Sequence, residues 1–75
     1  MRNRTQQVRD LDRIDRNILR LLQADGRMSM TDLAERIGLS VTPCSERVRR
    51  LERDGFILGY HARLNPQALG QNLLV

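Results

Sequence analysis

The sequence predicts a mainly α-helical fold, in which three helices are followed by a short β segment. Three observations lead to this prediction. Apolar residues recur at helical spacing in three stretches, residues that favour helix ends bound each stretch, and apolar residues alternate with others after the third. With 75 residues, 40% of them apolar, the chain can form one small domain with a thin core.

The first helix is expected to begin at Asp12, which can cap it, and to end near Asp25. Asp15 lies in the first turn, where a negative charge interacts favourably with the helix dipole. Gly26 can take the left-handed conformation that ends a helix. The apolar positions of this core helix are Leu11, Ile14, Ile18, Leu19, Leu21 and Leu22. The charges between them, Arg13, Asp15, Arg16 and Arg20, are interpreted as a solvated face.

A second helix is expected to start at Ser29, because Ser29 followed by Asp32 three residues later approximates a capping box. Gly38 ends this helix, which is therefore only about two turns long and needs packing partners to be stable. Its apolar face consists of Leu33, Ala34 and Ile37.

The third helix, over residues 40–54, is the stretch around which the rest of the chain is organised. Ser40 can act as its N-cap, Pro43 lies in the first turn, where its missing N–H is tolerated, and Gly55 can end the helix. One narrow face is apolar and carries Cys44, Val48 and Leu51. The outer face and its flanks carry Thr42, Ser45, Glu46, Arg47, Arg49, Arg50 and Arg53. Such a helix can rest on a small core and offer its arginines to phosphates and base edges.

The connection between the second and third helices is short, since only residues 38–40 separate them. A glycine at its start and a buried Leu39 at its centre set the two helices at a steep angle. This arrangement predicts a helix-turn-helix.

After Gly55 the pattern changes to the alternation of a strand, carried by Phe56, Leu58, Tyr60, Ala62 and Leu64. Gly59 interrupts the alternation and marks a break, a bulge or a turn. A turn there would make a small hairpin beside the helices, which is a wing. His61 is interpreted as a surface residue of this segment, with a phosphate contact as the alternative. Asn65 and Pro66 close the segment, and residues 66–70 are expected to form a helical turn or linker.

The two ends of the chain differ in character. Residues 1–9 carry Arg2, Arg4 and Arg9 and no acidic residue, and we expect a flexible basic arm. This arm is either a frayed tail or a segment that follows the DNA backbone or enters a minor groove. The apolar residues Leu73, Leu74 and Val75 are expected to begin a strand of a further domain.

The composition restricts the classes of function. The formal net charge of +4 fits a polyanionic partner, nucleic acid first and an anionic membrane surface only second. All 13 of the Lys and Arg residues are arginines, a pattern that suits bidentate contact with phosphate or guanine and is equally explained by genome composition. No stretch is long and apolar enough for a membrane span or a signal peptide, so we expect a cytoplasmic protein with no membrane partner. One cysteine and one histidine make neither a zinc site nor a catalytic pair, and Cys44 is interpreted as a small buried hydrophobe.

Taken together, these motifs resemble the Lrp/AsnC family, the leucine-responsive regulatory protein and asparagine-synthesis regulator group of bacterial and archaeal transcription factors. The resemblance covers about residues 10–75. The motifs that carry it are LDRIDRNIL at 11–19, DGR at 25–27, GLS at 38–40, TPC at 42–44, ERVRRLE at 46–52, GFI at 55–57, GY at 59–60 and LNP at 64–66.

The resemblance implies a winged helix-turn-helix DNA-binding domain over residues 10–64, with the helix-turn-helix itself at about residues 30–49. Position 18 of that window is Arg47, where many helix-turn-helix proteins have an apolar residue, so the second helix is expected to be rolled relative to the commonest form. Residues 65–75 are then a linker and the start of a C-terminal α/β domain, of which at most the first strand residues are present. In this family such a domain binds amino acids and assembles dimers into larger rings.

The resulting hypothesis is sequence-specific binding of double-stranded DNA by a transcriptional regulator of the nucleoid, with residues 40–54 in the major groove. Candidates for base contacts are Thr42, Ser45, Glu46 and Arg49. Candidates for phosphate contacts are Thr31, Ser40, Arg50, Arg53, Arg2 and Arg4. We expect no catalytic residue, no metal site and no cofactor in these residues. For the intact protein the resemblance implies an amino-acid effector and a homodimer or higher homo-oligomer.

Three other functions fit the sequence less well. A winged-helix module that binds another protein would use Val41, Phe56, Leu58 and Tyr60, but one Phe and one Tyr provide few anchors. Structured RNA is disfavoured because the chain has few aromatic residues for stacking. An enzyme would need Asp12 with Asp15, or Glu46 with Glu52, as paired carboxylates, and each pair is better explained as a helix start or a solvated face. No glycine-rich phosphate loop or nucleophile motif is present.

Overall fold

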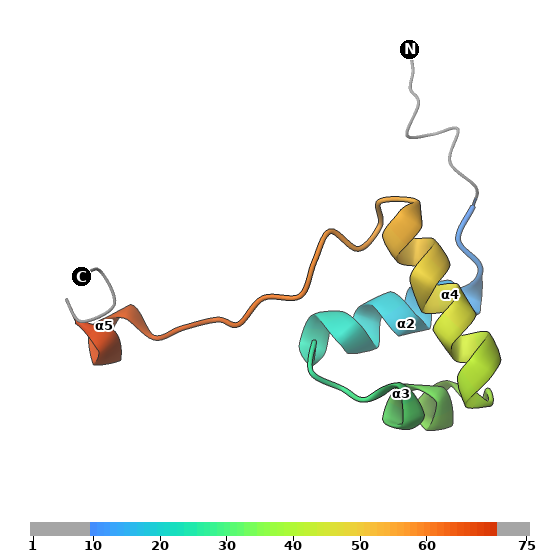
Figure 1. Ribbon diagram of the computed structural model, residues 1–75, viewed down its shortest axis with the longest axis horizontal. Helices are drawn as coiled ribbons and strands as arrows, with labels where there is room; N and C mark the ends of the chain where they lie inside the picture. The colour runs from blue at the N-terminus through green and yellow to red at the C-terminus, as the bar shows by residue number, and fades with distance from the viewer. Residues whose placement is uncertain (1–9, 71–75) are drawn as a thin grey trace, which may run out of the picture.

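The computed structural model describes residues 10–70 of the chain, which form a helical body followed by an extended segment (Figure 1). The body consists of α2 (Arg13–Ala24), α3 (Met30–Ile37) and α4 (Val41–Arg53). A single helical turn, α5 (Pro66–Leu69), lies at the far end of the extended segment, away from the body (Figure 1). The predicted mainly helical fold and its three principal helices are thus confirmed.

Helix α2 begins as its sequence predicts, but it ends by a different mechanism. The Asp12 carboxylate accepts a hydrogen bond from the backbone N–H of Asp15 at 2.8 Å. At the other end, Gly26 does not take the expected left-handed conformation. The helix ends at Asp25, whose backbone is extended and whose N–H donates to the Leu21 carbonyl. The Asp25 carboxylate accepts a hydrogen bond from the backbone N–H of Arg27 at 3.0 Å, which forms an Asx turn just after the helix.

Helices α3 and α4 have the predicted boundaries. The Ser29 hydroxyl accepts a hydrogen bond from the backbone N–H of Asp32 at 3.0 Å and caps α3. Gly38, with φ of 80°, and Gly55, with φ of 85°, both adopt the left-handed conformation that only glycine takes without strain. Ser40 is the N-cap residue of α4, although its side chain makes no capping hydrogen bond.

The core joins all three helices of the body. Its buried members are Ile18 of α2, Leu33 and Ala34 of α3, and Cys44, Val48 and Leu51 of α4. The α4 contribution is the apolar seam that the helical period predicts. Burial raises the pKa of the Cys44 thiol, so the reactive thiolate is disfavoured and Cys44 packs as a small hydrophobe.

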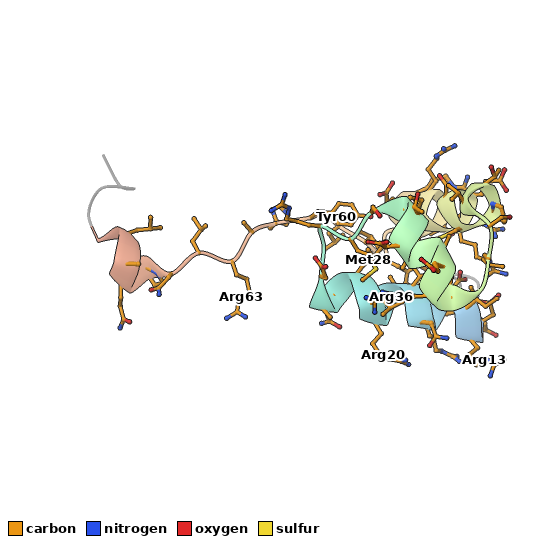
Figure 2. All side chains as sticks on the ribbon, turned by 90° about the horizontal axis from the view of Figure 1, so that it is seen from below. Arg13, Arg20, Met28, Arg36, Tyr60 and Arg63 are labelled. Atoms are coloured by element: carbon orange, nitrogen blue, oxygen red, sulfur yellow. The ribbon has the colours of Figure 1, made fainter. Side chains whose placement is uncertain are left out.

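One residue of the expected solvated face of α2 is not solvated. Asp15 has only 1% of its surface exposed, whereas Arg13, Arg16 and Arg20 of the same helix are exposed. Figure 2 shows Arg13 and Arg20 projecting from the lower edge of the molecule. A carboxylate buried this completely requires partners of opposite charge or hydrogen-bond donors. One such partner is Arg47 of α4.

The β segment expected after Gly55 is not confirmed. Within residues 10–70 no strand is present, and the chain from Ile57 to Asn65 runs outward without a neighbouring strand. A strand needs a second strand to accept its backbone hydrogen bonds. The alternating side chains also lack a common buried face, since Leu58 is 93% exposed and Leu64 is 58% exposed. His61 is exposed in this segment, as expected.

The helical turn expected at residues 66–70 is confirmed as α5. The Asn65 side chain accepts hydrogen bonds from the backbone N–H groups of Gln67 and Ala68, and Pro66 occupies the first turn. The predictions for the arm, including Arg2 and Arg4, and for the apolar residues 73–75 concern parts of the chain outside the described residues. Among the helices of residues 10–70, none has the length and apolar character needed to cross a membrane.

The core predicts how stability responds to truncation. Replacing the fully buried Leu51 by alanine should lower the free energy of unfolding by about 2–5 kcal/mol, because the change removes apolar contacts and leaves a cavity. Leu58→Ala is the matched control, since Leu58 is 93% exposed and its truncation should have little effect. Urea unfolding followed by circular dichroism measures both, and equal destabilisation by the two changes would contradict this account of the core.

Candidate nucleic-acid interface

The burial of the seam directs the opposite side of α4 to solvent. Thr42, Glu46, Arg49, Arg50 and Arg53 are exposed, and Ser45 is half-buried. All four predicted base-contact residues and two of the predicted phosphate-contact residues are therefore accessible on one helix. The structure places them as the helical period requires when Cys44, Val48 and Leu51 face the core.

A shallow hollow on this outer face brings four of these side chains together. It is lined by Glu46, Arg49, Arg50 and Arg53, which belong to successive turns of α4. Arg49 also donates a hydrogen bond from Nη2 to the Ser45 hydroxyl at 3.4 Å. Two base-contact candidates are thus neighbours in the unbound chain, and the long bond leaves them free to rearrange.

The arginines of the outer face are weakly engaged. Arg53 lies with its Nε 3.6 Å from a carboxylate oxygen of Asp54, and its side chain is 71% exposed. An ion pair this exposed contributes little stability and is readily exchanged for another anion. An anionic ligand can therefore replace Asp54 as the partner of Arg53 with little loss of free energy.

Two exposed hydroxyl groups lie at helix starts. Ser40 precedes α4 and is exposed, and its hydroxyl is not engaged in capping the helix. Thr31 is exposed in the first turn of α3, where Ser29 already supplies the cap. Helix starts carry unpaired backbone N–H groups and the positive end of the helix dipole, so both positions suit an anion.

Arg47, which the helical period predicts on the flank of the outer face, turns toward the body instead. Its Nη1 donates to the two carboxylate oxygens of Asp12 at 2.9 and 2.7 Å and to an Asp15 oxygen at 3.1 Å. The hydrogen bond to Asp12 is the largest cause that raises the pKa of Arg47 further above its usual range. Only 24% of the Arg47 side chain is exposed. The signal in the sequence was an arginine at a helix-turn-helix position that is commonly apolar, where it marks a side chain facing the body.

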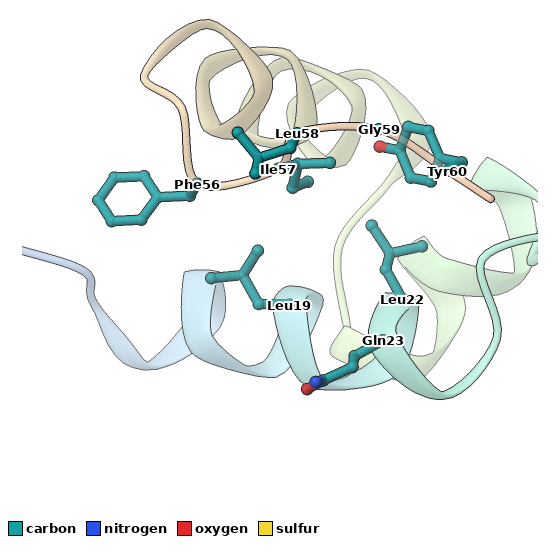
Figure 3. A pocket seen from close by; sticks show the side chains of 8 residues that line it. All are labelled: Leu19, Leu22, Gln23, Phe56, Ile57, Leu58, Gly59 and Tyr60. Atoms are coloured by element: carbon teal, nitrogen blue, oxygen red, sulfur yellow. The ribbon is translucent and has the colours of Figure 1, made fainter.

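A different surface, an apolar groove, lies between α2 and the segment that follows α4. Figure 3 shows Leu19 and Leu22 of α2 facing Ile57 and Leu58 across it. Its lining residues are Leu19, Leu22, Gln23, Phe56, Ile57, Leu58, Gly59 and Tyr60. Three of the four residues weighed for protein binding are among them, but Val41 is not. The residues of that alternative therefore do not line a single groove.

Tyr60 attaches the start of the extended segment to α4. Its hydroxyl donates a hydrogen bond to the Glu52 carboxylate at 2.8 Å. Its ring lines a hollow with residues of α2, α3 and α4, and a Cβ at Gly26 would lie 3.8 Å from the ring. Partial burial of the ring and the bond to Glu52 together raise the pKa of Tyr60 to about 12. Glu52 is thus a structural partner and faces away from the candidate interface.

The arrangement has the chemistry of a binding surface. Among the described residues, no cluster of histidine, cysteine and acidic side chains could hold a metal ion. The outer face of α4 combines donors, acceptors and positive charge on a rigid helix, which is suited to phosphates and base edges.

Known proteins that resemble this chain are DNA-binding regulators, in agreement with a nucleic-acid interface on α4. A family model described as winged helix-turn-helix DNA-binding matches residues 11–57. The leucine-responsive regulatory protein of Escherichia coli K12 is 67% identical to the chain over 67 residues, which cover 89% of the chain and 41% of that protein. The chain therefore spans less than half the length of this curated relative.

Solved structures give the same match. The AsnC family transcriptional regulator from Agrobacterium tumefaciens is similar with a TM-score of 0.75 and 46% identity, over 79% of this chain and 39% of that one. A transcriptional regulator from Neisseria meningitidis, solved in complex with L-Met, is similar with a TM-score of 0.78 and 40% identity, over 80% of this chain and 39% of that one.

The contact between Tyr60 and Glu52 predicts a high tyrosine pKa. Because the pKa of about 12 in the folded chain exceeds the ordinary 10.0, the contribution of the phenol to stability is complete below pH 10 and is lost as the pH rises towards 12. Near-ultraviolet absorbance can follow this titration cleanly, since the chain has one Tyr and no Trp. In Glu52→Gln the pKa should fall part of the way towards 10, because ring burial, the larger cause, remains. A wild-type value near 10 would show that the contact is absent in solution.

Proposed function

Because this chain belongs to the Lrp/AsnC family of transcriptional regulators, we propose that α4 is a recognition helix that lies in the major groove of double-stranded DNA. The observation that carries this proposal is the outer face of α4, where four predicted base-contact residues and two arginines are accessible on a helix fixed by its buried seam. The activity is DNA binding, and the relatives are regulators rather than enzymes.

The residues that read the base sequence are Thr42, Ser45, Glu46 and Arg49, in the first two-thirds of α4. The N-terminal part of a recognition helix reaches deepest into the groove. Glu46 accepts from a cytosine amino group, and the Arg49 guanidinium forks onto a guanine. Each such pair contributes about 1–3 kcal/mol of discrimination when water is excluded from it.

The residues that hold the DNA backbone are Thr31, Ser40, Arg50 and Arg53. The two hydroxyls support this role because they lie at helix starts. The two arginines support it because they are exposed on the outer face of α4. Arg2 and Arg4 belong to the same group on the ground of their charge alone, since they lie outside the described residues. Contacts of this kind position the protein and carry no sequence information.

The intact regulator acts as a homodimer or a higher homo-oligomer. One domain of this size covers little DNA, so tight binding calls for two copies on a near-palindrome with half-sites about one helical turn apart. Residues 1–9 serve as a basic arm, residues 10–64 as the DNA-binding domain, and residues 65–75 as the linker to an α/β domain. The extended segment that leads to α5, and the span of only 41% of the curated relative, support this division.

The intact protein responds to an amino-acid effector. The support is the similar Neisseria meningitidis regulator, whose structure holds L-Met. The chain covers 39% of that regulator, and no cofactor or effector is assigned to the described residues. The site of action is the cytoplasm, on the nucleoid, where the DNA of a bacterial or archaeal cell is found.

The dependence of binding on salt tests whether the outer face docks on phosphates. A plot of log K against log salt concentration for duplex DNA should have a steep negative slope, reduced in Arg53→Ala by about 0.9 for the lost phosphate contact. Arg20→Ala is the matched control, because Arg20 is an exposed arginine that lies on α2 and should leave the slope unchanged. Binding that hardly responds to salt would point to the apolar groove and a protein partner instead.

Substitution of Arg49 tests the assignment of base readers. Arg49→Ala should relax discrimination at one base position by about 1–3 kcal/mol, since the guanine loses its bidentate partner. Sequence selection from a random DNA pool with the wild type and the variant measures this preference position by position. If Arg49→Ala weakened binding to all sequences equally, Arg49 would be a backbone contact and not a base reader.

A further inference from the structure

We propose that Arg47 is a positioning residue for DNA recognition. Held by Asp12 and Asp15, its guanidinium fixes how α4 is rotated about its own axis on the helical body, and it does not touch DNA itself. This inference rests on the proposed function of α4, and it assigns to one of the four arginines within seven residues a role different from that of its neighbours.

The position of Arg47 on the helix separates it from the reading face. Residues two apart on an α-helix differ by about 200° around the axis, so Arg47 faces the body while Arg49 faces outward. The distances agree, because Nη1 of Arg47 reaches both oxygens of Asp12 at 2.9 and 2.7 Å and an oxygen of Asp15 at 3.1 Å. The contact joins the middle of α4 to the start of α2.

The burial of Asp15 keeps Arg47 in this place. Asp15 is 1% exposed, and separating a buried carboxylate from a positively charged partner costs far more than breaking a surface ion pair. Moving the Arg47 guanidinium outward to a phosphate would separate its Nη1 from that carboxylate. Its charge is therefore already used within the domain, and it adds nothing to the counterions released on DNA binding.

The hydrophobic seam alone does not determine the exact rotation of α4 about its axis. Burial of apolar surface is non-directional and depends mainly on the area removed from water. The α4 seam is narrow and consists of Cys44, Val48 and Leu51, so it sets which side of the helix faces the body, while few apolar contacts define the finer rotation. Charge-assisted hydrogen bonds, in contrast, depend on distance and angle. The ion cluster therefore selects one rotation of α4, and with it the direction in which Thr42, Ser45 and Arg49 point.

The cluster also ties the rotation of α4 to the N-terminus of α2. Asp12 both accepts the bonds from Arg47 and caps α2 through the backbone N–H of Asp15. In the sequence, residues 1–9 end three positions before Asp12. The place where the basic arm is attached is thereby fixed relative to the reading face.

The first arm of the test measures DNA binding by Arg47→Met and Asp15→Asn. The probes are a duplex selected by the wild-type chain from a random pool and a duplex of unrelated sequence. Arg47→Met should bind the selected duplex about ten-fold or more weakly, the loss of roughly one base contact, with an unchanged salt slope. Asp15→Asn should also weaken binding to the selected duplex, although it removes a negative charge from a DNA-binding protein.

A direct phosphate contact predicts different signs for the same variants. Arg47→Met would then reduce the salt slope by about 0.9, and Asp15→Asn would bind both duplexes more tightly. Either result overturns the inference. Arg50→Met is the matched control, because this exposed arginine lies one turn further along α4 and should reduce the slope.

The second arm needs no DNA and separates this inference from the proposed function. Residual dipolar couplings of backbone amides give the orientation of α4 relative to α2 in solution. Arg47→Met should change that orientation, and Arg47→Lys should restore part of it, since one nitrogen makes all three contacts and an ammonium group offers three donors at one point. An orientation unchanged in Arg47→Met overturns the inference.

The outcomes remain distinguishable if a variant is unstable. Asp12 is 53% exposed, so Asp12→Asn is the milder change, and it should shift α4 and weaken selected binding in the same direction. Failure of the wild-type chain to bind any duplex at low salt would reject the proposed function alone. A shift of α4 in Arg47→Met would still support the positioning role in that case.

Discussion

All proposed contacts with DNA depend on the burial of one narrow seam of α4. Cys44, Val48 and Leu51 are held in the core of the body, and the helical period then turns the polar residues outward. Within residues 10–70 the core has six buried apolar members, drawn from three helices. In the described part of the chain, α4 packs against α2 and α3, so the geometry of its outer face is set by how these two short helices support it.

Two kinds of interaction share this support. The seam supplies attraction, because it removes apolar surface from water, and it sets which side of α4 faces the body. The polar contacts add precision. The left-handed glycines Gly38 and Gly55 fix where α4 is entered and left, and the hydrogen bonds of Arg47 to Asp12 and Asp15 depend on the exact rotation of the helix. A buried ion pair of this kind contributes little net stability, and its value lies in selecting one geometry.

Much of the fold could be predicted from the sequence because it is determined locally. Ser29 and the glycines Gly38 and Gly55 act on residues within one turn, and the seam follows from the period of a single helix. The expectations that failed depended on what a residue meets. Gly26 does not take the left-handed conformation, because α2 ends at the extended backbone of Asp25, and the β segment lacked a partner strand. The pairing of Asp15 with Arg47 joins residues 32 apart, which no local pattern reports. For the site, periodicity predicted which side chains of α4 are exposed, but the direction of Arg47 required the neighbouring helix.

The most direct test of the account is a map of which backbone amides change their NMR chemical shifts when duplex DNA is added. If the outer face of α4 binds DNA, the changes should concentrate in the first two-thirds of α4, at Ser40 and at the start of α3, while residues lining the apolar groove, such as Leu19 and Leu58, should change little. Changes centred on that groove, with α4 unaffected, would contradict the claim that the outer face of α4 is the surface that reads DNA.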